Sequence, residues 1–169
     1  MKKPLSILSA AALLPLASLV ADTAPQLPYH GDGHIMLNDC CLEWNEVASM
    51  APPAKIAVIE GDLAREVPFT FRLKLPENYE VRPHIHPAYE RVTVLSGTFH
   101  FAHGEEFDRD STMALRTGGV AIMPPGAPMF GYTEEETIIQ LHGTGPWGIE
   151  YLNPEDDPRN VGGENGDRE

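Results

Sequence analysis

The chain has 169 residues, a length typical of one domain with its own hydrophobic core. It carries 25 acidic and 12 basic residues, which give a formal net charge of −13. A surface of this sign repels nucleic acids and anionic lipids, so neither is an expected partner. The two cysteines, Cys40 and Cys41, are adjacent. Their Cα atoms lie about 3.8 Å apart across one peptide bond, closer than disulfides favour, so we expect no bond between them.

Residues 1–21 have the features of a secretory signal peptide. Lys2 and Lys3 precede an apolar run from Leu5 to Val20, which is short for a membrane span, and we expect cleavage after Ala21 or, as the alternative, after Ala24. Cleavage removes two of the 12 basic residues, so the excess of acidic residues rises from 13 to 15. We therefore expect a periplasmic or secreted protein with no membrane segment after processing.

The rest of the chain predicts one all-β domain between two polar ends. Residues 22–41 are rich in turn formers and predict a mobile N-terminal arm, and the acidic residues 154–169 predict a disordered tail. Between them, residues 42–153 contain short apolar runs separated by Gly, Pro, Asn and Asp, which favours a sandwich or barrel. The predicted strands are residues 42–47, 55–60, 69–75, 81–86, 90–95, 98–103, 113–116, 120–123, 129–133, 137–142 and 147–152.

Two histidines and a glutamate form a candidate metal-binding set. Side chains alternate along a strand, so His84 and His86 point the same way. The stretch Pro87 to Tyr89 interrupts the strand, and a turn or bulge there would place Glu90 on the histidine side. Imidazole and carboxylate ligands suit a divalent first-row metal. The alternative is a pair of hydrogen-bonded surface histidines. The presence of Glu90 and Gly97 favours the metal-binding interpretation over this one.

The spacing of these residues resembles that of the cupin superfamily. Its first motif is His-x-His, a glutamate four positions on and a glycine seven beyond that, which here are His84, His86, Glu90 and Gly97. The second motif resembles the stretch with Gly118, Pro124 and Gly126, but its last position holds Met129 where the motif has histidine. The resemblance covers residues 47–159, and the runs 94–100 and 141–154 look like those of small exported bacterial cupins.

This resemblance implies a single-domain double-stranded β-helix, or jelly-roll barrel, that holds one metal ion. It implies ligand roles for His84, His86 and Glu90, but no particular reaction, because this scaffold hosts enzymes and binding proteins alike.

Methionine at position 129 leaves three arrangements open. In the first, His84, His86 and Glu90 form a three-ligand site that water or substrate completes, which suits a Lewis-acid or oxygen-activating metal. In the second, the Met129 thioether is a ligand and favours copper. In the third, the metal site is degenerate and Met129 packs in the core, the commoner role of methionine.

Gln140 and His142 are candidate catalytic residues. Alternation places them on one face of the strand 137–142, with Ile139 and Leu141 on the other, and the polar face is a candidate for the barrel interior. There, His142 would replace the missing ligand or act as an acid or base beside the metal. The alternative is a hydrogen-bonded histidine at the rim.

The sequence therefore predicts a metal-binding protein whose ion coordinates a small polar molecule, with Gln140, His142 and Tyr89 near it. The metal is one divalent ion, either Fe, Mn, Zn, Ni or Cu. A metal-dependent dioxygenase is the first reaction class and an isomerase the second. The competing class is a non-catalytic ligand-binding or metal-sensing protein. A homodimer through edge strands is also expected, because pairing protects exposed backbone groups.

Overall fold

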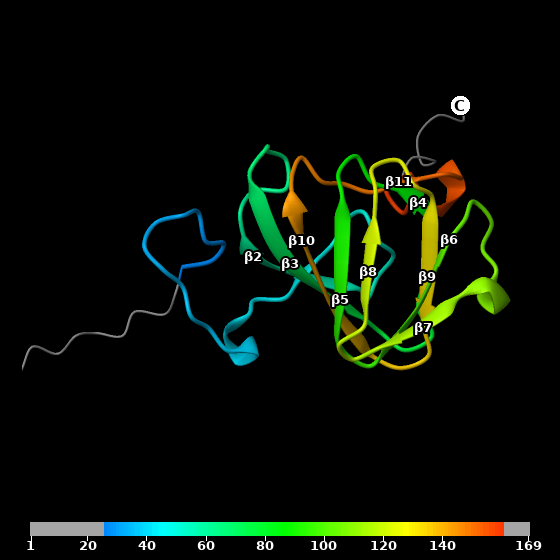
Figure 1. Cartoon of the computed structure of the whole chain (residues 1–169), viewed down its shortest axis with the longest axis horizontal. Coiled ribbons are helices and arrows are strands. Elements are labelled where there is room, and N and C mark those ends of the chain that lie inside the picture. Colours follow the sequence, from blue (N-terminus) through cyan, green and yellow to red (C-terminus); the bar gives the residue numbers. More distant parts are fainter. Residues whose placement is uncertain (1–25, 161–169) are drawn as a thin grey trace, which may run out of the picture.

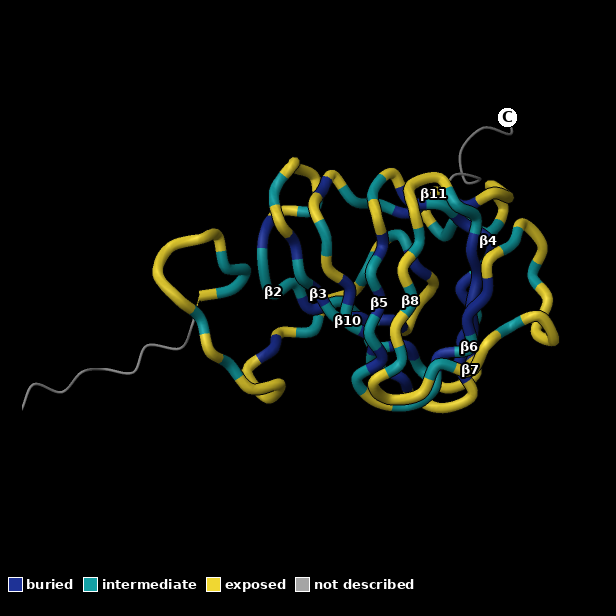
Figure 2. The backbone as a smooth tube through the Cα atoms, in the orientation of Figure 1, coloured by how far each residue is buried: buried dark blue, intermediate teal, exposed yellow. Residues whose placement is uncertain are grey.

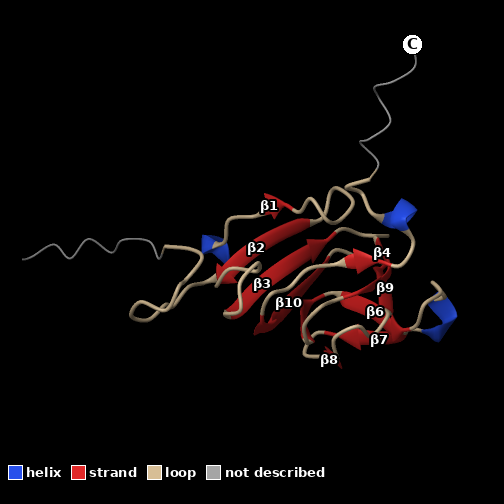
Figure 3. Cartoon of the chain, turned by 90° about the horizontal axis from the view of Figure 1, so that it is seen from above, coloured by secondary structure: helices blue, strands red, loops and turns tan. Residues whose placement is uncertain are grey.

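Two antiparallel β-sheets face each other in the structure, a computed structural model that describes residues 26–160 (Figures 1 and 3). One sheet has six strands in the order β1 (Asn45–Glu46), β2 (Lys55–Glu60), β3 (Pro68–Leu75), β10 (Thr137–Thr144), β5 (Glu90–Ser96) and β8 (Val120–Met123). The other has the order β11 (Glu150–Tyr151), β4 (Glu80–Ile85), β9 (Met129–Thr133), β6 (Thr98–His103) and β7 (Met113–Arg116). Three-residue 3₁₀ turns lie at Asp39–Cys41, Arg109–Ser111 and Pro154–Asp156. The predicted all-β jelly-roll class is confirmed.

Alternation of apolar side chains sets which face of each strand is buried. In β3, Phe69, Phe71, Leu73 and Leu75 are at most 5% exposed, while the residues between them are partly exposed. Their apolar partners come from both sheets, and Figure 2 shows buried stretches along the strands and exposed ones mainly in the loops. Burial of each such side chain contributes about 1.5–3 kcal/mol, so the space between the sheets is the hydrophobic core.

The chain passes from one sheet to the other between β4 and β5. The sequence predicts these segments as one interrupted strand, but β4 pairs with β9 and β11, whereas β5 pairs with β10 and β8. Residues 86–89 make the crossing, and Pro87 within them has no N–H with which to continue a ladder. A register shift between Val81 and His84 also lets both side chains face the interior.

Gly97 makes the tight turn between β5 and β6. Its φ is +76°, in the left-handed region that favours glycine. A Cβ at this position would lie 2.5 Å from Oγ1 of Thr137 and 2.7 Å from the carbonyl oxygen of Glu136. The glycine of the first motif is therefore required by the close approach of the chain before β10.

The ends of the described chain have more fixed contacts than the sequence suggests. The Tyr29 backbone N–H donates to the Ile59 carbonyl at 2.8 Å and its carbonyl accepts from Gly61 N at 2.9 Å, which anchors the arm beside β2. At the other end, Arg159 donates to the Ile149 carbonyl at 3.0 Å. These contacts fix one point of the arm through its backbone and one point of the tail through the Arg159 side chain, while the expected mobility of the arm and disorder of the tail stay predictions.

The expected signal peptide, residues 1–21, and the end of the acidic tail, residues 161–169, lie outside the described residues. Within residues 26–160, no helix is long and apolar enough to cross a membrane.

Candidate metal centre

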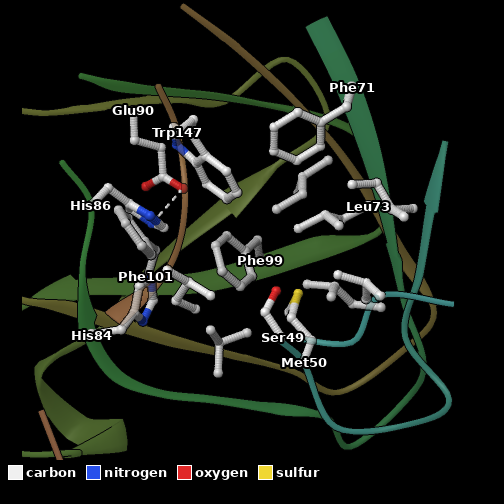
Figure 4. A pocket seen from close by; sticks show the side chains of 16 residues that line it. Ser49, Met50, Phe71, Leu73, His84, His86, Glu90, Phe99, Phe101 and Trp147 are labelled. Atoms are coloured by element: carbon white, nitrogen blue, oxygen red, sulfur yellow. Dashed lines mark ion pairs between the residues drawn. The ribbon is translucent and has the colours of Figure 1, made fainter. Parts of the chain in front are cut away.

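His84, His86 and Glu90 come together inside the barrel. His84 lies in β4, His86 follows the end of that strand, and Glu90 begins β5 in the other sheet. Their exposed fractions are 4%, 2% and 6%, and all three line the same cavity (Figure 4). The crossing between the sheets therefore turns the carboxylate toward the imidazoles, as the sequence predicts.

Backbone carbonyls fix both imidazoles. Nδ1 of His84 lies 2.7 Å from the Arg82 carbonyl oxygen, and Nδ1 of His86 lies 2.5 Å from that of Gly148. A carbonyl only accepts, so each Nδ1 carries the proton and donates. In the neutral ring Nε2 then holds a free lone pair, the arrangement that second-shell partners impose on metal-binding histidines.

One buried atom of His86 and one of Glu90 have no hydrogen-bond partner. Nε2 of His86 lies 3.3 Å from Oε1 of Glu90, yet Nε2 has no hydrogen-bond partner, and neither has Oε2 of Glu90. Two donors that share one metal at about 2.1 Å are separated by about 3.0–3.4 Å. The separation of these two atoms therefore fits two ligands of one ion.

Burial keeps His84 neutral. Its pKa is lowered to about 4, chiefly by burial and then by His86, against the opposing effects of Glu90 and the Arg82 carbonyl. At neutral pH the ring is therefore uncharged, which is the protonation state that a metal requires.

His84, the third proposed donor, lies next to His86 and Glu90 but is not in a coordinating position. The rings of His84 and His86 have centroids 4.8 Å apart and planes at 74°. Across residues 26–160, no group of three or more His, Cys, Asp or Glu side chains is already arranged to hold a metal ion. Coordination by all three residues would therefore require a local movement of side chains.

The cavity beside these residues is small and largely apolar. It contains about 40 Å³ of free space, room for about three water molecules. Its polar side chains are His84, His86, Glu90 and, at the far end, Ser49 (Figure 4). The other lining residues are apolar or aromatic: Val47, Met50, Ile56, Phe71, Leu73, Leu75, Val81, Phe99, Phe101, Ile139, Trp147 and Ile149. None of the described lining residues is a lysine or arginine.

Two buried tyrosines hold the segment that closes the far end of this cavity. The Tyr79 hydroxyl donates to the Ala51 carbonyl at 2.7 Å, and the Tyr151 hydroxyl donates to that of Ser49 at 2.9 Å. Burial raises the pKa of Tyr79, and it raises the pKa of Tyr151 to about 12, with a smaller contribution from Asp157. Both phenols therefore remain protonated donors well above neutral pH.

Trp147 is a site residue that the strand pattern does not reveal. Its ring stacks on His86 with centroids 4.5 Å apart and planes at 22°, and it meets Phe71 edge-on at 4.8 Å. The adjacent Gly148 supplies the carbonyl that fixes His86. The sequence predicts a strand over residues 147–152, but only Glu150 and Tyr151 form one, so Trp147 and Gly148 lie in the irregular stretch before β11.

Solved structures identify the architecture. The polyketide cyclase RemF from Streptomyces resistomycificus matches with a TM-score of 0.62 at 14% identity, over 75% of this chain and 91% of that chain. An RmlC-like cupin from Ralstonia eutropha matches with a TM-score of 0.57 at 17% identity, over 74% and 76% of the two chains. The protein has the cupin fold.

This cupin barrel also resembles part of a larger enzyme. Salicylate 1,2-dioxygenase from Pseudoaminobacter salicylatoxidans, solved with gentisate, matches with a TM-score of 0.51 at 14% identity, over 63% of this chain and 31% of that chain. No family model and no curated protein matches the sequence.

Gln140 and His142 do not face the cupin interior, so their expected placement beside the metal is wrong. In β10, Ile139 and Leu141 are buried at 3% and 1% exposure, while Gln140 accepts from Arg72 Nε at 3.1 Å on the outer face and His142 is exposed. Burial of the two aliphatic side chains decides the orientation of the strand.

Tyr89 also lies away from the cavity. It is 49% exposed, and the guanidinium of Arg91 lies 5.2 Å from its ring centre. The expected place for Tyr89 near the bound molecule is therefore wrong, and the tyrosine belongs to the outer surface.

Met129 is part of the hydrophobic core of the cupin barrel. It is 0% exposed and lies opposite His84 in the pairing of β9 with β4, but it does not line the cavity. The thioether therefore fills core space, as the third arrangement has it, and the same position is equally compatible with the three-ligand site of the first arrangement.

Replacement of Met129 by leucine tests this role. The Met129→Leu variant is expected to keep the metal affinity of the unchanged protein and to lose less than about 1.5 kcal/mol of stability, because volume is conserved. Titrations with Zn²⁺ and Cu⁺ measure the affinity. A loss of about tenfold or more for Cu⁺ alone would identify the sulfur as a ligand.

The buried phenol of Tyr151 predicts a loss of stability at alkaline pH. Unfolded tyrosine ionises near about pH 10, whereas folded Tyr151 keeps its proton to about pH 12. The folded state therefore holds more protons in this window, so its stability is full below pH 10 and falls as the pH rises toward 12. Tyr151→Phe should cost about 1 kcal/mol at neutral pH and reduce the alkaline slope.

Urea unfolding followed by circular dichroism at pH 7, 10 and 11 measures both effects. Tyr89→Phe is the matched control, because this tyrosine is half exposed. An alkaline slope that is the same in Tyr151→Phe and the unchanged protein would contradict the assignment.

Proposed function

We propose that this protein binds one divalent first-row metal ion through His84, His86 and Glu90 and binds a small molecule in the adjoining cavity. The observation that carries the proposal is the pair of buried acceptors without partners, Nε2 of His86 and Oε2 of Glu90. Each such group costs about 1–3 kcal/mol when buried unpaired. A cation between them would satisfy both.

The residues around the donors support the proposal. The Arg82 and Gly148 carbonyls keep the lone pairs of the two Nε2 atoms free, and Glu90 provides negative charge in a wall that has no lysine or arginine among the described residues. The aromatic side chains limit access of water, which strengthens electrostatic interactions at the site. A bound metal would supply Lewis acidity and open coordination positions.

A metal-dependent dioxygenase is the first reaction class that we propose. The support is the similar barrel of salicylate 1,2-dioxygenase and a three-donor site that leaves coordination positions free. An isomerase is the second class. The alternative is a non-catalytic protein that binds a ligand or senses metal, which Met129 favours because it fills core space where the second cupin motif has histidine.

Two further properties are proposed from the sequence. The predicted signal peptide favours export to the periplasm or beyond. The exposed edge strands β7 and β8, with Met113, Val120 and Ile122 more than half exposed, favour a homodimer.

Substitution of the donors tests the metal site. His86→Ala and Glu90→Gln are expected to lower the affinity for Mn²⁺, Fe²⁺, Ni²⁺, Cu²⁺ and Zn²⁺ by at least about 100-fold, because each removes a proposed ligand. Equilibrium dialysis followed by elemental analysis gives both the number of bound ions and the affinity.

His142→Ala is the matched control, because it removes a histidine from the outer face. One bound ion in the unchanged protein and in His142→Ala, but not in the two donor variants, is the expected pattern. Equal metal content in all four proteins would refute the site.

Oxygen uptake separates the two functional classes. The Fe²⁺-loaded protein is incubated with a panel of phenols and small acids, and the oxygen consumed is compared with that of Glu90→Gln. If the protein is a dioxygenase, at least one compound is consumed in step with oxygen, and only when Glu90 is present. Tight metal binding without consumption of any compound would favour the non-catalytic alternative.

A further inference from the structure

Three buried side-chain polar atoms have no hydrogen-bond partner among the described residues, and all three belong to one end of the cavity. They are Nε2 of His86, Oε2 of Glu90 and Nε1 of Trp147. The first two are acceptors, and the proposed metal would satisfy them. The indole Nε1–H is a donor only, so a cation cannot satisfy it. Once the proposed metal occupies the two acceptors, the Trp147 N–H still needs an acceptor.

Packing prevents Trp147 from turning to find a partner elsewhere. One face of its ring stacks on His86, and Phe71 meets it edge-on. Phe69 lies close as well, with ring centres 6.0 Å apart. In Figure 4 the indole nitrogen lies on the Glu90 side of the ring, and the opposite end of the ring extends into the cavity. The direction of the N–H is thus fixed beside the proposed metal donors.

We propose that the Trp147 N–H donates a hydrogen bond to an oxygen atom of the bound molecule and so orients it beside His86 and Glu90. This inference rests on the proposed function, because it concerns the ligand of the same site. It makes Trp147 a ligand-positioning residue, which neither the two sequence motifs nor the alternation of the strands reveals.

The remaining walls define the chemical class of the ligand. Apart from the donor set and Ser49, the lining is aliphatic or aromatic and includes no lysine or arginine among the described lining residues, so only the proposed metal ion would balance a charge on the ligand. The chain as a whole carries a net charge of −13, which opposes the approach of anions. The free space of about 40 Å³ limits the buried part to a few non-hydrogen atoms. The lining therefore fits a small molecule with an apolar body and one oxygen acceptor.

Acetone and 2-methylpropene form a matched pair of probes for this donor. They have the same shape, but only acetone has an oxygen acceptor. Each is titrated into uniformly ¹⁵N-labelled, Zn²⁺-loaded protein while the indole N–H resonances are recorded. The chain has two tryptophans, so Trp44 provides an internal reference. Trp44 does not line the cavity and lies under Lys74, whose Nζ is 4.6 Å from the ring centre.

Acetone should move the Trp147 indole proton downfield in a saturable manner and leave Trp44 unchanged, whereas 2-methylpropene should produce no downfield shift. Trp147→Phe keeps an aromatic ring beside His86 but removes the N–H. In this variant the affinity for acetone, followed through the methyl resonances of Ile139 and Ile149, should fall about fivefold, as expected for one neutral hydrogen bond. The affinity for 2-methylpropene should not change. Trp44→Phe is the control variant and should bind both probes normally.

The outcomes separate this inference from the metal proposal. Zinc binding together with equal responses to the two probes, or with an acetone affinity that Trp147→Phe leaves unchanged, would overturn the role of the N–H while the metal site stands. Failure to bind zinc would overturn the metal site, and the same titration on the metal-free protein then tests the donor alone. Retained zinc affinity in Trp147→Phe shows that the loss of acetone binding does not come from a collapsed site.

Discussion

The contact between Nδ1 of His86 and the carbonyl of Gly148 joins the two parts of the chain that make the site. The residues are 62 positions apart in the sequence, one at the sheet crossing and the other in the irregular stretch before β11. The bond fixes the protonated nitrogen of His86, and the neighbouring Trp147 lies flat against the same ring. As a result, the Nδ1 side and one face of the His86 ring are occupied, and its Nε2 faces Glu90 at 3.3 Å from Oε1. The geometry of the centre depends on this constraint.

Much of the barrel follows from local sequence, because alternation and turn residues agree along most of the chain. The predicted limits of β2, β6, β7, β8 and β9 coincide with those of the structure. The predicted edge strand 42–47 is shorter, since only Asn45 and Glu46 pair with β2. The sheet crossing after β4 is not visible as such in the sequence. Proline and the following residues indicate an interruption, but the choice of a new sheet depends on partners far along the chain.

The candidate site was predictable where spacing alone determines geometry. His84 and His86 share a face by alternation, and the resemblance to the first cupin motif adds Glu90. The sequence does not determine which face of β10 is internal. One face carries the aliphatic Ile139 and Leu141, and the other carries Gln140 and His142, whose polar side chains would suit a metal site. Aliphatic burial outweighs that possibility, since Ile139 and Leu141 both gain from leaving water. Trp147 was missed because the sequence places it at the start of a strand over residues 147–152, whereas the structure pairs only Glu150 and Tyr151 and leaves Trp147 in an irregular connection.

The charge balance inside the barrel gives the strongest physical reason for a cation at this site. Glu90 is 6% exposed, and transfer of a carboxylate out of water costs several kcal/mol unless an opposite charge is near. The described cavity wall has no lysine or arginine, and the adjacent Arg91 lies on the outer face, over Tyr89. Burial also lowers the pKa of His84, so this ring does not supply the positive charge at neutral pH. Nε2 of His86 lies 3.3 Å from Oε1 of Glu90, within ion-pair distance. The proposed divalent metal ion would supply two positive charges at this point and accept the lone pairs of the two fixed imidazoles.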